Sequence, residues 1–183
     1  MFVVLVTGAS GAGKSAVSRW LAARGHDALS LDGYEGLCTW VDECGEAVQR
    51  PDHPSREWLS RHAWIWRPDV LDRLLEDARG RGTGTLWLAG HAENLEEVLD
   101  RFDLRVLLRI DQATLRSRLD DPSRGNDHGR VGASRAHVVA TFEEFQSRLA
   151  RCCEREVDAT DELDVVGEAL VRQVAPVRGR PGT

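Results

Sequence analysis

The feature that most constrains this chain is a glycine-rich segment close to its N-terminus. An apolar run at residues 2–6 leads into Gly8, and Gly13, Lys14 and Ser15 complete the spacing Gly-x-x-x-x-Gly-Lys-Ser. Glycines at such positions let successive backbone N–H groups turn inward around an anion. A helix at 15–24 would point its positive N-terminal end at the same anion. A strand, this loop and a helix in succession are typical of a phosphate-binding loop.

We therefore expect the loop to bind the phosphates of ATP together with Mg²⁺. Lys14 should reach the β- and γ-phosphates, and the Ser15 hydroxyl should bind the metal ion. Lys14 is the only lysine in the chain, whereas arginine occurs 23 times. A planar guanidinium is a poor replacement for an ammonium at this position. The expected nucleotide-binding residues of the loop are Gly8, Ala9, Ser10, Gly11, Ala12, Gly13, Lys14, Ser15 and Ala16.

A dinucleotide-binding loop is the main alternative for the same segment. Gly11, Gly13 and Ala16 fit the spacing Gly-x-Gly-x-x-Ala, and Asp32 lies about where a ribose-binding acid would follow. That fingerprint has no use for Lys14, and its first glycine should follow the strand directly. Here Gly8 follows the strand and Gly11 comes three residues later. The sequence therefore favours the triphosphate loop.

Apolar runs and helical periodicities alternate along the rest of the chain. We expect strands at residues 2–6, 28–31, 86–89, 106–110 and 156–158. Helices are expected between them: one from Pro68, one capped by Asn94 with Glu97 three residues on, one from Asp111, and two at 138–149 and 163–170. This order predicts an α/β fold, a P-loop NTPase-type three-layer αβα sandwich with a parallel five-stranded sheet.

Composition narrows the classes of protein that the chain can represent. Its 183 residues are 42% hydrophobic with a formal net charge of −6, which predicts one globular domain. The negative charge argues against a nucleic acid or an anionic membrane as partner. No run approaches the ~20 apolar residues of a membrane span, and residues 1–6 are too short for a signal peptide. We expect a cytoplasmic monomer or homodimer.

Beyond the loop, the chain resembles the small P-loop kinases related to adenylate, shikimate and nucleoside kinases, over most of residues 1–172. The loop lies within the first fifteen residues, Asp32 ends the second expected strand, and Gly90 ends the third. The fourth strand leads into Leu115-Arg116-x-Arg118-Leu119 and then Arg124, which resembles an arginine-bearing lid. Asp158-Ala159-Thr160 resembles the segment that passes the adenine ring.

The resemblance implies roles for particular residues. Asp32 is the expected base or metal-organising acid, with Glu93 and His91 as alternatives, and Ser15 and Asp32 are the expected metal ligands. Arg118 and Arg124 would stabilise the charge that spreads over a transferring phosphoryl group. Asp158, Ala159 and Thr160 would contact the nucleotide base. The chain departs from the pattern because Gly90, and no Walker-B acid, ends the third strand.

The expected organisation is a kinase-like domain at 1–172 with two special segments, followed by a flexible tail at 173–183. Residues 33–67 are expected to be short helices and loops that bind the acceptor, and Trp64 and Trp66 are expected to line it. Residues 120–132 would form a short lid. The predicted function is ATP-dependent transfer of the γ-phosphoryl group to a small molecule, such as a nucleoside or nucleotide, a polyol acid or a natural product. The alternatives are a nucleotide-dependent switch ATPase and a catalytically silent nucleotide-binding module.

Overall fold

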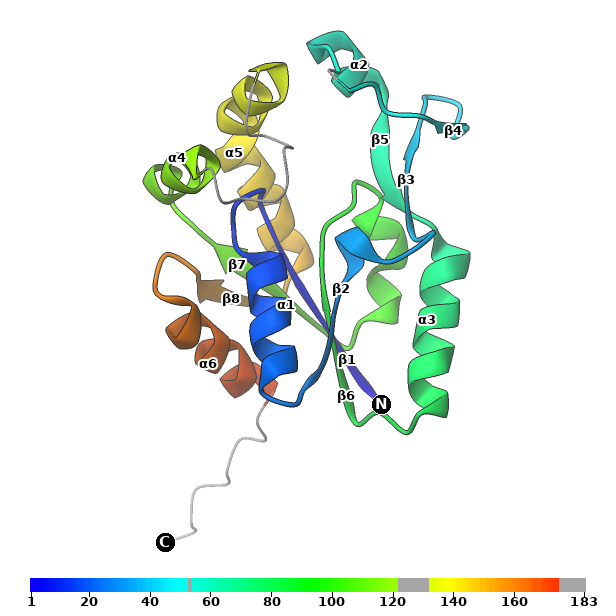
Figure 1. Cartoon of the computed structure of the whole chain (residues 1–183), viewed down its shortest axis with the longest axis vertical. Coiled ribbons are helices and arrows are strands. Elements are labelled where there is room, and N and C mark those ends of the chain that lie inside the picture. The colour runs from blue at the N-terminus through cyan, green and yellow to red at the C-terminus, as the bar shows by residue number, and fades with distance from the viewer. Residues whose placement is uncertain (53, 122–131, 175–183) are drawn as a thin grey trace, which may run out of the picture.

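The central element of the fold is a five-stranded parallel sheet, seen in a computed structural model that describes residues 1–52, 54–121 and 132–174 (Figure 1). Its strand order is β2-β6-β1-β7-β8. The strands are β2 (Asp27–Ser30), β6 (Thr85–Ala89), β1 (Phe2–Gly8), β7 (Leu104–Arg109) and β8 (Arg155–Asp158). The predicted fold class is confirmed, and the glycine-rich loop follows the central strand.

Helices cover both faces of this sheet because its strands are apolar on both sides. Along β1, Val4 and Val6 belong to one buried cluster, and Val3 and Leu5 belong to the other. The first cluster is covered by α1 (Lys14–Ala23), α4 (Gln112–Asp120) and α6 (Leu163–Val174). The second is covered by α3 (Pro68–Gly80) and the 3-10 helix η2 (Leu95–Arg101). The long helix α5 (Gly132–Cys152) contributes Phe142 to one cluster and Leu149 to the other.

The segment 33–67 carries a second sheet, which corrects the expectation of short helices and loops. Its antiparallel strands have the order β4-β3-β5, with β3 (Cys38–Val41), β4 (Ala47–Val48) and β5 (Ala63–Trp66). A short helix α2 (Arg56–Arg61) precedes β5, and a 3-10 turn η1 (Leu31–Gly33) leads in from β2. Tryptophan and valine favour strands, but strands of two to four residues leave too little alternation to be recognised in the sequence.

Asn94 does not cap a helix, which corrects a second expectation. The structure gives it no side-chain capping bond, and the element that follows is the 3-10 helix η2. Its amide instead pairs with β5: Oδ1 accepts from the Trp66 N–H at 3.0 Å, and Nδ2 donates to the Trp66 carbonyl at 2.9 Å. The Glu93 N–H donates to the Trp64 carbonyl at 2.8 Å. The loop after β6 is thus joined directly to the second sheet.

Most of the predicted lid and most of the predicted tail lie outside the residues that the structure describes. Residues 122–131 of the lid and 175–183 of the tail are not described.

The helix predicted from Asp111 is present as α4, with the Asp111 carboxylate accepting from the Thr114 N–H at 2.7 Å. Within the described residues, no helix is both long enough and apolar enough to cross a membrane.

Candidate active site

The phosphate loop has the backbone shape that its glycines predict. Gly11 and Gly13 have φ angles of +86° and +96°, in the left-handed region that favours glycine. Gly8 is required for a different reason, since a Cβ there would lie 2.8 Å from the Leu108 carbonyl oxygen and 2.9 Å from the Ala12 Cβ. The loop therefore packs tightly against β7, and α1 begins at its end.

Lys14 reaches back across this loop. Its Nζ donates to the Gly8 carbonyl at 2.9 Å and to the Ala9 carbonyl at 3.1 Å. The ammonium is thus held beside the loop where phosphate oxygens would lie. Ser15 follows in the first turn of α1, so the two residues of the motif that carry side-chain chemistry lie at the same helix N-terminus.

Arg118 joins the phosphate loop to the segment after β8. Its guanidinium donates to the Gly11 carbonyl at 3.2 Å and to the Ala159 carbonyl at 2.7 Å. It is half-buried there, and this burial lowers the pKa of Arg118. In the same segment the Asp158 carboxylate accepts from the Thr160 N–H at 2.9 Å. Arg118 therefore links the phosphate loop to the segment that the sequence predicted to contact the nucleotide base. The other predicted arginine, Arg124, lies outside the described residues.

Asp32 lies two residues beyond the end of β2, in the turn η1. The sequence placed it correctly at the carboxyl edge of the sheet. Its Oδ1 lies 3.5 Å from the backbone N of His91. Gly90 allows this approach, because a Cβ there would meet Leu31 and Trp66 atoms at 2.9 Å and Asp32 Oδ1 at 3.2 Å.

Ser15 and Asp32 carry the type of oxygen atom that a magnesium ion would need if it took its remaining ligands from phosphate and water. The Asp32 carboxylate is exposed and forms no ion pair with any described residue. Among the described residues, no group of three or more His, Cys, Asp or Glu side chains could hold a metal alone. Mg²⁺ characteristically takes one or two protein oxygens and completes its shell with phosphate and water. Ser15 and Asp32 are of the required type.

His91 is half-buried. Both ring nitrogens are inaccessible to solvent and have no hydrogen-bond partner in the described part of the chain. The ring lies edge-on to Phe145 of α5, with 4.8 Å between ring centroids. Burial, with the charges of Lys14 and Arg148, lowers the pKa of His91 to about 3. The imidazole is therefore neutral at physiological pH.

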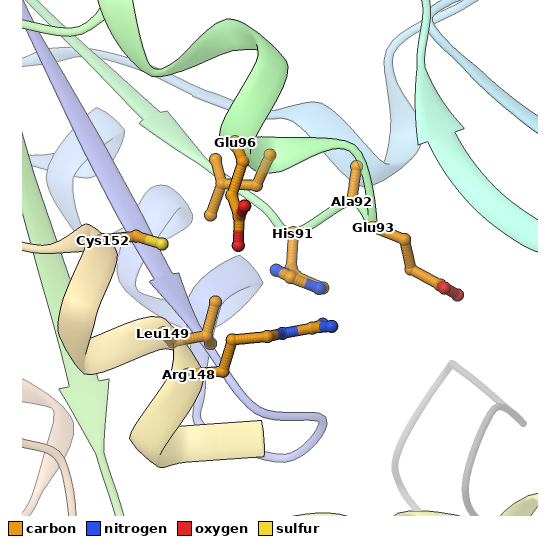
Figure 2. Close-up of a pocket in the computed structure, with 8 residues that line it drawn as sticks. His91, Ala92, Glu93, Glu96, Arg148, Leu149 and Cys152 are labelled. Atoms are coloured by element: carbon orange, nitrogen blue, oxygen red, sulfur yellow. The ribbon is translucent and has the colours of Figure 1, made fainter. Parts of the chain in front are cut away.

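His91 and Arg148 also border a small cavity together with Glu96 and Cys152 (Figure 2). Its volume is about 10 Å³, which is close to the minimum that admits one water molecule. The Arg148 guanidinium lies 5.5 Å from the Phe145 ring centroid and forms no ion pair among the described residues. The sequence did not indicate Arg148, because only the packing of α5 brings it to the loop after β6.

Glu93 also borders this cavity and lies beside the second sheet. Its carboxylate is 3.5 Å from the Trp64 N–H. Burial raises the pKa of Glu93, while the Trp64 N–H, Arg148 and His137 act in the opposite direction. Both carboxylates that the sequence named as a base thus lie near His91: Asp32 Oδ1 approaches its backbone N, and Glu93 borders the same cavity.

The tryptophans of segment 33–67 divide into two groups. Trp66 is fully buried in the core and packs against Phe102, which corrects its expected place in the acceptor site. Trp40, Trp58 and Trp64 are half-buried, and the Trp40 ring contacts the other two at centroid distances of 5.0 Å and 5.5 Å. We call these three residues the aromatic wall.

This arrangement defines a class of protein: a P-loop fold with an added sheet that is joined to the loop after β6. The chain belongs to the AAA domain family, whose family model matches residues 4–139. No curated protein matches the sequence.

Solved structures share the fold at low sequence identity. TT1252 from Thermus thermophilus is 18% identical with a TM-score of 0.59, over 97% of this chain and 98% of that one. The shikimate kinase of Bacteroides thetaiotaomicron is 14% identical with a TM-score of 0.57, over 96% and 99%. The deoxyadenosine kinase of M. mycoides with bound dATP is 13% identical with a TM-score of 0.51, over 96% and 100%. The predicted resemblance to small P-loop kinases is thereby confirmed for the fold.

Proposed function

We propose that this protein is a kinase that transfers the γ-phosphoryl group of ATP to a small molecule. The observation that carries the proposal is the attachment of the second sheet to the loop after β6 through Glu93 and Asn94. That loop follows the strand next to β1, so a molecule held by the second sheet would lie beside the phosphate loop. Ligands of open α/β sheets bind at this carboxyl edge. Two of the structural neighbours are kinases of small molecules.

The phosphate loop, residues 8–16, would bind the triphosphate. Backbone N–H groups and the N-terminus of α1 would hold the phosphate oxygens, and Lys14 would exchange its carbonyl partners for the β- and γ-phosphates. Ser15 and Asp32 would hold Mg²⁺, which when bound neutralises charge on those oxygens. Asp158, Ala159 and Thr160 would contact the base. Arg118, which already touches Gly11 and Ala159, would lie beside both ends of the nucleotide.

The acceptor would lie between Asp32, the aromatic wall and the loop after β6. Flat indole rings suit an acceptor that contains a ring. Asp32 would accept the proton of the attacking hydroxyl, for which a carboxylate needs hydrogen-bond reach. Glu93 is the second candidate for this step, because its raised pKa brings a carboxylate nearer to neutral pH. Arg118 and Arg124 would stabilise the charge on the transferring group.

A thermal-shift screen tests this proposal. The protein would be saturated with a non-hydrolysable ATP analogue and exposed to nucleosides, nucleotides, polyol acids and antibiotics. A ligand at about 100 times its Kd adds about 2.7 kcal/mol to stability, which raises Tm by roughly 5–10 °C in a domain of this size. Lys14→Ala should abolish the response to the analogue. The proposal fails if only a protein or a nucleic acid stimulates ATP hydrolysis and no small molecule is phosphorylated.

A further inference from the structure

The two ring nitrogens of His91 are, with Thr7 Oγ1, buried side-chain atoms near the phosphate loop that have no hydrogen-bond partner within the described chain. A buried polar atom without a partner destabilises the folded state, and both ring nitrogens of His91 are in this condition. A phenylalanine would fill the same space against Phe145 without that cost. A costly polar group kept in such a place indicates a partner that binds only in the functional state.

The position of His91 identifies the chemistry of that partner. It follows Gly90, whose N–H donates to the Val6 carbonyl of β1 at 3.1 Å, so it lies at the edge where the phosphate loop begins. The positive charges that act on its ring come from Lys14 and Arg148. Lys14 is the residue that meets the terminal phosphates in this type of loop. A group that binds beside these two cations would be an anion.

We propose that His91 donates a ring N–H to the γ-phosphoryl group of the bound nucleotide and so distinguishes triphosphate from diphosphate. An imidazole has at least one N–H donor in either protonation state, so the ring can donate a hydrogen bond to a phosphoryl oxygen. Lys14 would leave the Gly8 and Ala9 carbonyls for the phosphates. This inference rests on the proposed triphosphate site.

The neighbouring cavity offers the competing explanation. It could hold one water molecule that satisfies a ring nitrogen in all states of the protein. In that case His91 would be a structural residue, and its replacement would change stability without changing the preference for triphosphate.

Binding of AMPPNP and of ADP to four proteins, measured by titration calorimetry, separates these explanations. The proteins are the wild type, His91→Phe, His91→Asn and His91→Gln. We expect His91→Phe to fold with an unchanged or raised Tm, to bind AMPPNP about tenfold or more weakly, and to bind ADP as the wild type does. The two amide variants keep a donor near the position of Nδ1 or Nε2, and one of them should restore AMPPNP affinity. They also keep the test valid if His91→Phe fails to fold.

Each outcome has a definite meaning for the two proposals. If every folded variant keeps the wild-type ratio of AMPPNP to ADP affinity, His91 does not touch the γ-phosphoryl group and the inference is overturned, while the proposed function stands. If the variants lose affinity for both nucleotides equally, His91 supports the loop and the inference is also overturned. If the wild type binds neither nucleotide, both proposals fail.

Discussion

Replacing Gly13 by alanine should strain the phosphate loop and lower the free energy of unfolding by an amount that the structure predicts, while the rest of the fold stays intact. Gly13 has a φ angle of +96°, and its hypothetical Cβ would meet only Arg118 Nη1 at 3.7 Å, an ordinary contact. The cost is therefore backbone strain alone, about 1–2 kcal/mol for an L-residue in the left-handed region. For a domain of this size that cost corresponds to a fall in Tm of roughly 2–8 °C.

Gly25 provides a matched control for this substitution. Its φ angle is +84°, and its hypothetical Cβ would meet nothing within 4 Å. Gly25→Ala should therefore lose about the same stability. Only Gly13→Ala should lose ATP affinity, by about tenfold or more, because relaxation of the strained residue rotates the N–H groups away from the phosphates. Calorimetric titration of both variants with ATP measures this difference. Equal ATP affinity in the two variants would refute the assignment of the loop.

Three further predictions concern the acceptor side of the site. Trp66→Leu should lower the free energy of unfolding, measured with denaturant, by about 2–3 kcal/mol. Trp64→Leu should lower it by less than about 1 kcal/mol and should chiefly raise the KM of the acceptor. Equal losses of stability in the two variants would contradict the division between core and aromatic wall. Asp32→Asn should lower turnover about 100-fold or more with a much smaller change in ATP affinity, and a loss below about threefold would transfer the role to Glu93. Asn94→Leu should cost about 1–3 kcal/mol, because it leaves the N–H and carbonyl of Trp66 unpaired, and should speed hydrogen exchange at the Trp66 amide; unchanged exchange would show that the contact does not hold the second sheet.

The central sheet and the phosphate loop could be predicted from the sequence because both depend on local patterns. Buried parallel strands are short apolar runs, and β1, β6 and β7 each appear as one. The loop needs glycines at fixed positions, and its shape follows from residues 8–15 alone. Asp111 as a helix cap is equally local, since its partner Thr114 is three residues away.

The second sheet and the burial of the His91 ring nitrogens could not be predicted because they depend on contacts between distant residues. The Asn94 amide binds Trp66, 28 residues earlier, and nothing near Asn94 distinguishes that use from a helix cap. The His91 ring lies against Phe145 of α5, whose packing no local pattern predicts. For the same reason Trp64 and Trp66 look alike in the sequence, although one belongs to the aromatic wall and the other to the core.

The most direct test of the proposed function follows the terminal phosphate of ATP. The wild type and Lys14→Ala would be incubated with ATP labelled in the γ-phosphoryl group and with each compound that raises Tm in the thermal-shift screen. The account predicts that label passes to one class of small molecule in step with ADP formation, and that Lys14→Ala transfers none. Label released by the wild type only as inorganic phosphate, with no labelled acceptor in any class, would contradict the assignment of this protein as a kinase.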